Sequence, residues 1–217
     1  MSELKVTVVD YGMGNLLSVQ RAFEHCGAEV ELTDNPRRIA NAERLVLPGV
    51  GAFANCMAGL KLRHLVEPVR SLAGTDRPFL GICVGMQILL EESEEFGRCE
   101  GLGLIPGRVE AIPRTTSEGR PHKVPHIGWT AIHQPEEANG DRWAGSILEP
   151  VAPGSATYFV HSYTAVPANP ADRLADSRYN GRLVSAAIAR DNICATQFHP
   201  EKSGEVGLAM IRRFLAL

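Results

Sequence analysis

A cysteine between two glycines, in the segment Gly81-Ile-Cys83-Val-Gly85, is the residue of this chain best suited to covalent chemistry. The apolar run before it indicates a strand, and residues 84–90 after it suit a helix. A cysteine with G-x-C-x-G spacing at such a junction predicts a nucleophile elbow, a strained turn that presents the sulfur at the edge of a sheet. Only the thiolate is nucleophilic, and a helix N-terminus and a nearby cation both favour it. A cysteine without such glycines is more often a small buried hydrophobic residue, which is how we interpret Cys26, Cys56, Cys99 and Cys194.

A candidate base lies far along the chain, in the segment His199-Pro200-Glu201. It follows the apolar run Ile193 to Phe198, and the carboxyl ends of parallel strands share one edge of a sheet. Pro200 stiffens the backbone, so the carboxylate of Glu201 can orient the imidazole. Cys83, His199 and Glu201 then supply nucleophile, base and orienting group for covalent attack on a carbonyl carbon. Taken alone, the His-Pro-Glu segment is also typical of a polar loop before a helix.

The turn Pro48-Gly49-Val50-Gly51 follows an expected strand, so it belongs at the same edge as Cys83. Two glycines around one β-branched residue let a peptide unit turn its N–H toward a developing oxyanion, which makes Val50 and Gly51 candidate donors. The second donor is expected at Val84, the residue after the nucleophile. The alternative is an ordinary tight loop between a strand and a helix.

Composition limits the remaining possibilities. The chain has 217 residues, 44% of them hydrophobic, which predicts one sizeable core and a single domain over residues 1–217. Its 22 basic and 25 acidic residues give a net charge of −3, so a large basic field for nucleic acid is excluded. Five cysteines without a C-x-x-C pair argue against a zinc site or a disulfide framework. No apolar run approaches membrane-spanning length and no signal peptide precedes the first strand, so we expect a reduced, cytoplasmic protein without a membrane contact.

Strands and helices are expected to alternate up to the elbow, which favours an α/β fold with a mostly parallel sheet and helices on both faces. The expected elements are strands at Val6–Asp10, Ala28–Leu32, Leu45–Leu47 and Phe79–Ile82, a helix at Leu16–Cys26 capped by Gly27, and helical turns near Pro36 and from Ala52. From Gly101 the pattern predicts a β-rich second half that ends in a strand and a helix. Its expected elements are strands at Val109–Ile112, Trp129–His133, Thr157–Tyr163, Leu183–Ala189 and Ile193–Phe198, polar loops at Thr115–Pro121 and Gln134–Gly145, and the helix Val206–Leu217.

Six segments in order along the chain resemble the class I glutamine amidotransferases and, within that class, the glutaminase subunits of imidazole glycerol phosphate synthases. They are Tyr11–Asn15, Leu47–Phe53, Gly81–Gln87, Val124–Trp129, Tyr158–Tyr163 and Thr196–Ser203. The resemblance implies a flavodoxin-like fold and a Cys-His-Glu triad that releases ammonia from glutamine, with no metal or organic cofactor. It also implies a heterodimer with a (β/α)8-barrel cyclase subunit, which uses the ammonia to make imidazole glycerol phosphate and AICAR in histidine biosynthesis. The chain leaves no length for such an acceptor domain.

Further residues are expected to bind glutamine or the partner. The residues expected at the substrate are Gly49, Gln87, Glu95, His161, Ser162 and Tyr163, of which Gln87 follows the resemblance. Tyr11 and Asn15 are expected at the partner, because their loop leaves the first strand at the same edge of the sheet as Cys83. Gln87 is almost as well explained by a solvent-facing position, His161 by a satisfied place in the core, and Glu95 by a solvated surface. The other five histidines, His25, His64, His122, His126 and His133, lack a local partner that would make them catalytic candidates.

Two other functions remain open at this stage. One is a different class I glutaminase subunit, such as that of pyridoxal phosphate synthase, on the same fold. The other is a non-catalytic binding subunit, whose signature would be the loss of a triad residue, and the sequence retains all three. The segment Gly12-Met-Gly14 does not complete a dinucleotide-binding fingerprint, because Leu17 stands where the third glycine would be.

Overall fold

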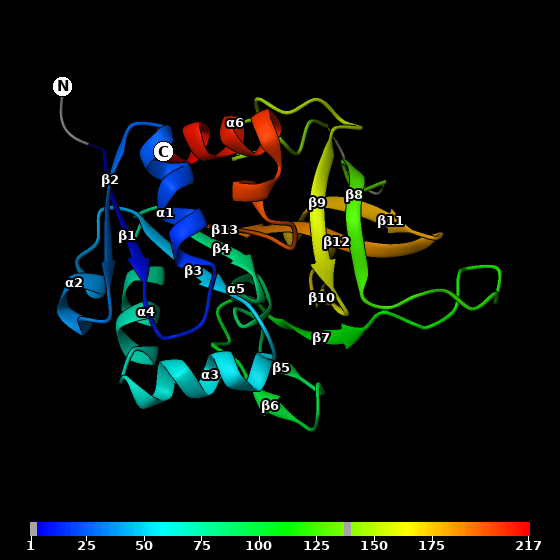
Figure 1. Ribbon diagram of the computed structural model, residues 1–217, viewed down its shortest axis with the longest axis horizontal. Helices are drawn as coiled ribbons and strands as arrows, with labels where there is room; N and C mark the ends of the chain where they lie inside the picture. Colours follow the sequence, from blue (N-terminus) through cyan, green and yellow to red (C-terminus); the bar gives the residue numbers. More distant parts are fainter. Residues whose placement is uncertain (1–3, 137–139) are drawn as a thin grey trace.

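The computed structural model describes residues 4–136 and 140–217. Strands and helices alternate in its first half, as the sequence predicts (Figure 1). The elements of this half are β1 (Leu4–Val9), α1 (Leu16–His25), β2 (Ala28–Thr33), α2 (Pro36–Ala40), β3 (Leu45–Gly49), α3 (Phe53–Leu62), α4 (Val66–Ala73), β4 (Phe79–Cys83) and α5 (Val84–Gln87).

The second half is rich in strands, again as predicted. Its elements are β5 (Glu92–Ser93), β6 (Cys99–Glu100), β7 (Gly107–Ala111), β8 (His126–His133), β9 (Ala156–His161), β10 (Tyr163–Pro167), β11 (Arg173–Tyr179), β12 (Arg182–Arg190), β13 (Ile193–Thr196) and α6 (Gly204–Leu215), with short 3₁₀ helices at Pro170–Asp172 and Pro200–Lys202. The predicted loop Thr115–Pro121 is irregular apart from one bridge between its ends. Part of the other predicted loop, residues 137–139, lies outside the described residues.

Within the described ranges, nine strands form one sheet in the order β2-β1-β3-β4-β13-β12-β11-β8-β9. The strands from β2 to β13 are parallel to one another, and those from β13 to β9 pair antiparallel. A smaller sheet has the order β10-β7-β5-β6. The α/β prediction is therefore confirmed, and most of the β-rich second half extends the parallel sheet rather than standing apart from it.

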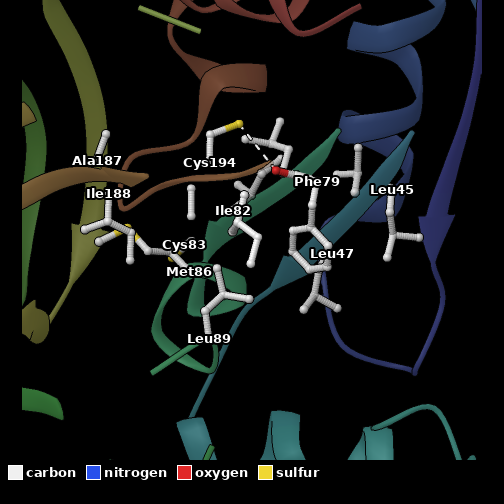
Figure 2. Close-up of a cluster of buried hydrophobic side chains, with 14 of the residues drawn as sticks. Leu45, Leu47, Phe79, Ile82, Cys83, Met86, Leu89, Ala187, Ile188 and Cys194 are labelled. Carbon is white, nitrogen blue, oxygen red and sulfur yellow. Dashed lines mark hydrogen bonds between the residues drawn. The ribbon is translucent and has the colours of Figure 1, made fainter. Parts of the chain in front are cut away.

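Helices cover both faces of the parallel part of the sheet (Figure 1). α1 and α6 share one face, where Phe23 meets Phe214 edge to face with ring centroids 6.0 Å apart. Strands β3 and β4 consist entirely of buried residues, which is typical of parallel strands covered on both sides. Their side chains, including Leu45, Leu47 and Phe79, form the core directly behind Cys83 (Figure 2).

The register of these strands positions the site. Gly49 of β3 pairs with Cys83 of β4, and Thr196 of β13 pairs with Ile82. The turn after β3, the elbow after β4 and the segment after β13 therefore leave the sheet side by side, as expected for neighbouring parallel strands.

Three sequence expectations need correction. The helix after Cys83 ends at Gln87, because the carbonyls of Ile88, Leu89 and Leu90 accept hydrogen bonds from residues 102–105 instead of continuing the helix. The single strand expected over residues 157–163 is two strands interrupted at residue 162: β9 pairs with β8, and β10 pairs with β7 in the smaller sheet. Helix α4 and strand β11 were not anticipated.

No helix within residues 4–136 and 140–217 is long and apolar enough to cross a membrane.

Candidate active site

The elbow has the strained backbone that the sequence predicts. Cys83 has φ 57° and ψ −113°, a backbone conformation with positive φ that residues other than glycine rarely adopt. Glycine is required nearby, because a Cβ on Gly85 would lie 1.9 Å from the carbonyl oxygen of Leu47. A Cβ on Gly81 would meet Ala195 and Gly85 at 3.0 Å. The two glycines thus let Leu47 of β3 and Ala195 of β13 pack closely against the elbow.

His199 follows β13 at the same edge of the sheet and is held from several sides. Its Nδ1 lies 2.8 Å from Oε1 of Glu201, and both side chains are almost fully buried. Its backbone N–H donates to Tyr158, and its carbonyl accepts from the Ser203 hydroxyl at 2.7 Å. Its Nε2 makes no hydrogen bond within the described part of the chain, so that nitrogen is available to a substrate or thiol proton. This is the base-and-orienter arrangement that the His-Pro-Glu segment predicts.

The electrostatic environment favours a charged imidazole. Burial disfavours the imidazolium, but the interactions of His199 with Cys83 and Glu201 outweigh it and raise the pKa of His199 well above its ordinary value. A protonated imidazole next to the sulfur stabilises the thiolate, the reactive form of a cysteine nucleophile. His199 is therefore hydrogen-bonded to Glu201 and lies close enough to Cys83 for their charges to interact.

Gln197 was not identified from the sequence, although it contacts the nucleophile. It is fully buried, and its Nε2 donates to the Cys83 sulfur at 3.8 Å. Its Oε1 accepts from Nε2 of Gln87 at 2.9 Å, and Gln87 also donates to the Tyr163 carbonyl. Gln87 is thus buried and not solvent-facing. A buried amide two residues before the base, at the end of an apolar strand, is the signal that could have identified Gln197.

A pocket of about 300 Å³ lies over Cys83. Besides Cys83 and His199, it is lined by Val50, Gly51, Val84, Gln87, Glu95, Pro125, Val160, His161, Ser162 and Tyr163. The predicted nucleophile, base, oxyanion donors and most predicted substrate residues therefore come together from distant parts of the chain. Pro125 and Val160 were not anticipated.

Two predicted residues have a different position from the one expected. Gly49 does not line the pocket but packs against the elbow, where a Cβ would lie 2.6 Å from the N of Gly85. Tyr11, which is predicted to contact a partner, is only 1% exposed. Its hydroxyl donates to the Pro48 carbonyl at 2.6 Å instead. Asn15, also predicted at the partner surface, is partly exposed.

Glu95 reaches the pocket from the loop after β5. Its Oε2 accepts the backbone N–H of Phe53, the first residue of α3, at 2.7 Å. This bond fixes a carboxylate in the wall of the pocket, where it suits a substrate ammonium group.

Two histidines form a buried pair in another wall. Nδ1 of His126 lies 3.0 Å from Nε2 of His161, and Nδ1 of His161 lies 2.8 Å from the Tyr163 carbonyl. Since that carbonyl accepts, His161 Nδ1 carries a hydrogen, and His126 donates to His161. Burial lowers the pKa of His126 to about 4 and that of His161 to about 3. His161 is therefore a satisfied residue that also lines the pocket, and His126 has a partner that the sequence did not indicate.

These lowered pKa values predict that acid destabilises the fold. The unfolded chain takes up protons on both histidines as the pH falls below about 6.5, whereas the folded protein keeps them neutral down to much lower pH. The stabilisation is complete above that pH and is lost as the pH falls toward 4 for His126 and toward 3 for His161, with a slope of at most about 1.4 kcal/mol per pH unit for each histidine. Urea unfolding at pH 7, 6, 5 and 4.5 should show a shallower pH slope for His126→Phe than for the unsubstituted protein. The control His25→Gln removes an exposed histidine and should leave the slope unchanged; equal slopes for all three proteins would contradict the assignment.

A larger cavity of about 470 Å³ lies at the other end of β4 and β13, lined by residues that include Asp76, Arg142, Asp191 and Asn192. Its only cysteine, Cys194, is an unsuitable nucleophile, because burial raises the pKa of its thiol to about 12 and the sulfur donates to the Phe79 carbonyl (Figure 2). The pocket at Cys83 is therefore the better candidate for the active site, although it is the smaller of the two.

Comparison with known proteins agrees with this site. Residues 7–217 match the family model of class I glutamine amidotransferases. The chain is 50% identical over 212 residues to imidazole glycerol phosphate synthase subunit HisH 1 of Legionella pneumophila, covering 98% of this chain and 99% of that protein. It is 47% identical to subunit HisH of Syntrophotalea carbinolica, covering 96% and 98%. Among solved structures, PurLQS from Thermotoga maritima superposes with a TM-score of 0.68 at 20% identity, covering 100% of this chain and 99% of that one, a likeness of fold alone.

Proposed function

The chain belongs to the class I glutamine amidotransferase family, and from that premise we propose that it is the glutaminase subunit of an imidazole glycerol phosphate synthase. The observation that carries the catalytic part is the strained elbow of Cys83, which shares one pocket with His199, itself held by Glu201 at 2.8 Å. The near full-length similarity to HisH subunits supports this particular synthase and treatment of the chain as one domain.

The proposed reaction begins with glutamine in the pocket and the thiolate of Cys83 beside the side-chain amide. The sulfur attacks the amide carbon, and the tetrahedral oxyanion receives hydrogen bonds from the N–H of Val84 and from the turn that contains Val50 and Gly51. Imidazolium His199 protonates the departing nitrogen, which leaves as ammonia. Neutral His199 then takes a proton from water as the water attacks the thioester carbon, and collapse of the intermediate breaks the C–S bond. The thiolate of Cys83 and imidazolium His199 are restored, and the new carboxylic acid leaves as glutamate after losing its proton to solvent.

Substrate selection follows from the walls of the pocket. Glu95 supplies a fixed carboxylate for the α-ammonium of glutamine. The segment at Ser162 and Tyr163 offers polar groups to the α-carboxylate. Gln87 also lines the pocket, and its side chain is held in place by hydrogen bonds to Gln197 and Tyr163.

Ammonia released into bulk water is mostly protonated and is then no nucleophile, so we propose direct delivery to a (β/α)8-barrel cyclase subunit. An apolar surface beside the pocket supports a docking site for it. Ile127 and Trp129 of β8 are 59% and 57% exposed, and Ile127 pairs across the strands with Val160, which lines the pocket. Exposed large apolar groups at the mouth of a site are typical of protein interfaces.

The partner is expected to control the reaction. The isolated chain should hydrolyse glutamine very slowly, and the cyclase subunit with an analogue of its nucleotide substrate should raise kcat by about two to three orders of magnitude, the scale of one oxyanion donor. Steady-state glutamate release by the chain alone, with the partner, and with partner plus analogue measures this. Full activity of the isolated chain would contradict activation by the partner. Stimulation only by the barrel subunit of pyridoxal phosphate synthase would show that the chain belongs to that synthase instead.

The docking surface is tested separately, by partner binding. Trp129→Ala should weaken binding of the cyclase subunit while leaving the glutaminase fold intact, as measured by titration calorimetry and circular dichroism. Leu62→Ala removes an apolar side chain at the end of α3 that is more exposed than Trp129, 77% against 57%, and this variant should bind normally. Equal affinities of the two variants for the cyclase subunit would show that Trp129 is not part of the docking surface.

A further inference from the structure

Two buried side chains hold the turn Pro48–Gly51 from behind. The hydroxyl of Tyr11 donates to the Pro48 carbonyl at 2.6 Å, and the thiol of Cys56 donates to the Val50 carbonyl at 3.5 Å. Both side chains are at most 1% exposed, and neither lines the pocket. They therefore act on the turn without touching glutamine.

Both groups keep the hydrogens that these bonds require. Burial raises the pKa of the Cys56 thiol to about 11. Burial, and secondarily the neighbouring Cys56, raises the pKa of Tyr11 well above its ordinary value. Tyr11 cannot easily move away, because α3 presses on it: a Cβ on Gly59 would lie 2.8 Å from its carbonyl oxygen.

These two bonds fix two of the three peptide units in the turn. A trans peptide is planar, so a carbonyl held in one direction points the next N–H in the opposite direction. Tyr11 thereby sets the unit between Pro48 and Gly49, and Cys56 sets the unit between Val50 and Gly51. Among residues 4–136 and 140–217, no side chain bonds to the unit between Gly49 and Val50. The elbow limits translation of the turn, since Gly49 lies against the backbone of Gly85.

We propose that Tyr11 and Cys56 are positioning residues for the oxyanion site. They hold both ends of the turn, so that only the peptide unit between Gly49 and Val50 is free to rotate. The N–H of Val50 is thereby placed at the oxyanion. The inference rests on the proposed glutaminase function and adds residues that do not contact the substrate. An oxyanion donor acts on the transition state and not on bound glutamine, so a misplaced turn lowers kcat and leaves KM nearly unchanged.

The test uses the complex with the cyclase subunit and its substrate analogue. Tyr11→Phe and Cys56→Ala should each lower kcat for glutamine hydrolysis about tenfold or more, with KM for glutamine changed less than about twofold. Cys56→Ser keeps a hydroxyl donor and should restore most of the rate. Cys194→Ala is the matched control, because it removes another buried thiol that donates to a backbone carbonyl, away from the turn. It should behave like the unsubstituted protein.

A second readout separates positioning from general damage. Alkylation of Cys83 by iodoacetamide forms no oxyanion, so its rate should be the same in Tyr11→Phe, Cys56→Ala and the unsubstituted protein. An unchanged kcat, a loss of kcat matched by slower alkylation, or no rescue by Cys56→Ser would overturn the inference. If the unsubstituted complex itself released no glutamate, the proposed function would fail first, and that result is distinguishable from the others.

Discussion

Cys83→Ala is expected to abolish glutamine hydrolysis while leaving the fold and binding of the partner unchanged. The covalent step depends on one sulfur at the elbow, and alanine removes it without adding bulk to a backbone that already meets its neighbours closely. Removing a nucleophile from a comparable triad costs about six orders of magnitude in kcat. The measurement is glutamate release by the complex, with circular dichroism and analytical ultracentrifugation to verify fold and assembly.

Chemical labelling tests the same assignment independently. A diazo-ketone analogue of glutamine should modify Cys83 well before the other cysteines, since it must bind in the pocket that Cys83 lines. Cys56 and Cys194 are fully or almost fully buried, and their high pKa values keep them as unreactive thiols. Peptide mapping that located the adduct mainly at Cys26, Cys56, Cys99 or Cys194 would show that Cys83 is not the nucleophile.

His199→Asn is expected to be nearly as damaging as loss of the cysteine, whereas Glu201→Gln should be milder by about one to two orders of magnitude in kcat. His199 moves protons in both halves of the reaction, while Glu201 orients the imidazole and stabilises its charged form without transferring a proton. The variants are compared by steady-state kcat of the activated complex at one pH and saturating glutamine.

A matched carboxylate provides the control for that comparison. Glu205→Gln changes an exposed glutamate in the first turn of α6 and should leave kcat unaffected. Equal losses from Glu201→Gln and His199→Asn, with intact folds, would show that Glu201 does more than orient the base.

The sequence predicts the triad because each part has a local signal. Glycine spacing marks the elbow at Cys83, and the proline after His199 marks a stiff turn next to a strand. The parallel arrangement then brings these two strand ends together, which the pairing of β4 with β13 confirms. Neither inference requires knowledge of how any side chain packs.

Features that depend on packing were missed. β11 contains Asp176 and Ser177, two polar residues that are unusual in a buried strand. They are accommodated because Arg173 pairs with Asp176 and the Ser177 hydroxyl donates to the Ala131 carbonyl. The contact of Gln197 with Cys83 joins residues 114 positions apart. Tyr11 was expected at the surface because its loop leaves the correct edge of the sheet, but its side chain turns inward to Pro48.

The buried histidine pair has a consequence for the product of the reaction. Ammonia becomes useless to an acceptor once it picks up a proton, and an acidic group in the wall of the pocket would supply one. His161 lines that wall as a neutral imidazole, and its one N–H is occupied by the Tyr163 carbonyl. Its neighbour His126 is also neutral at physiological pH and directs its own N–H at His161. All ring nitrogens of this pair are already hydrogen-bonded and neither ring is charged, so the pair has no proton to give to ammonia and leaves the nitrogen a base until it departs.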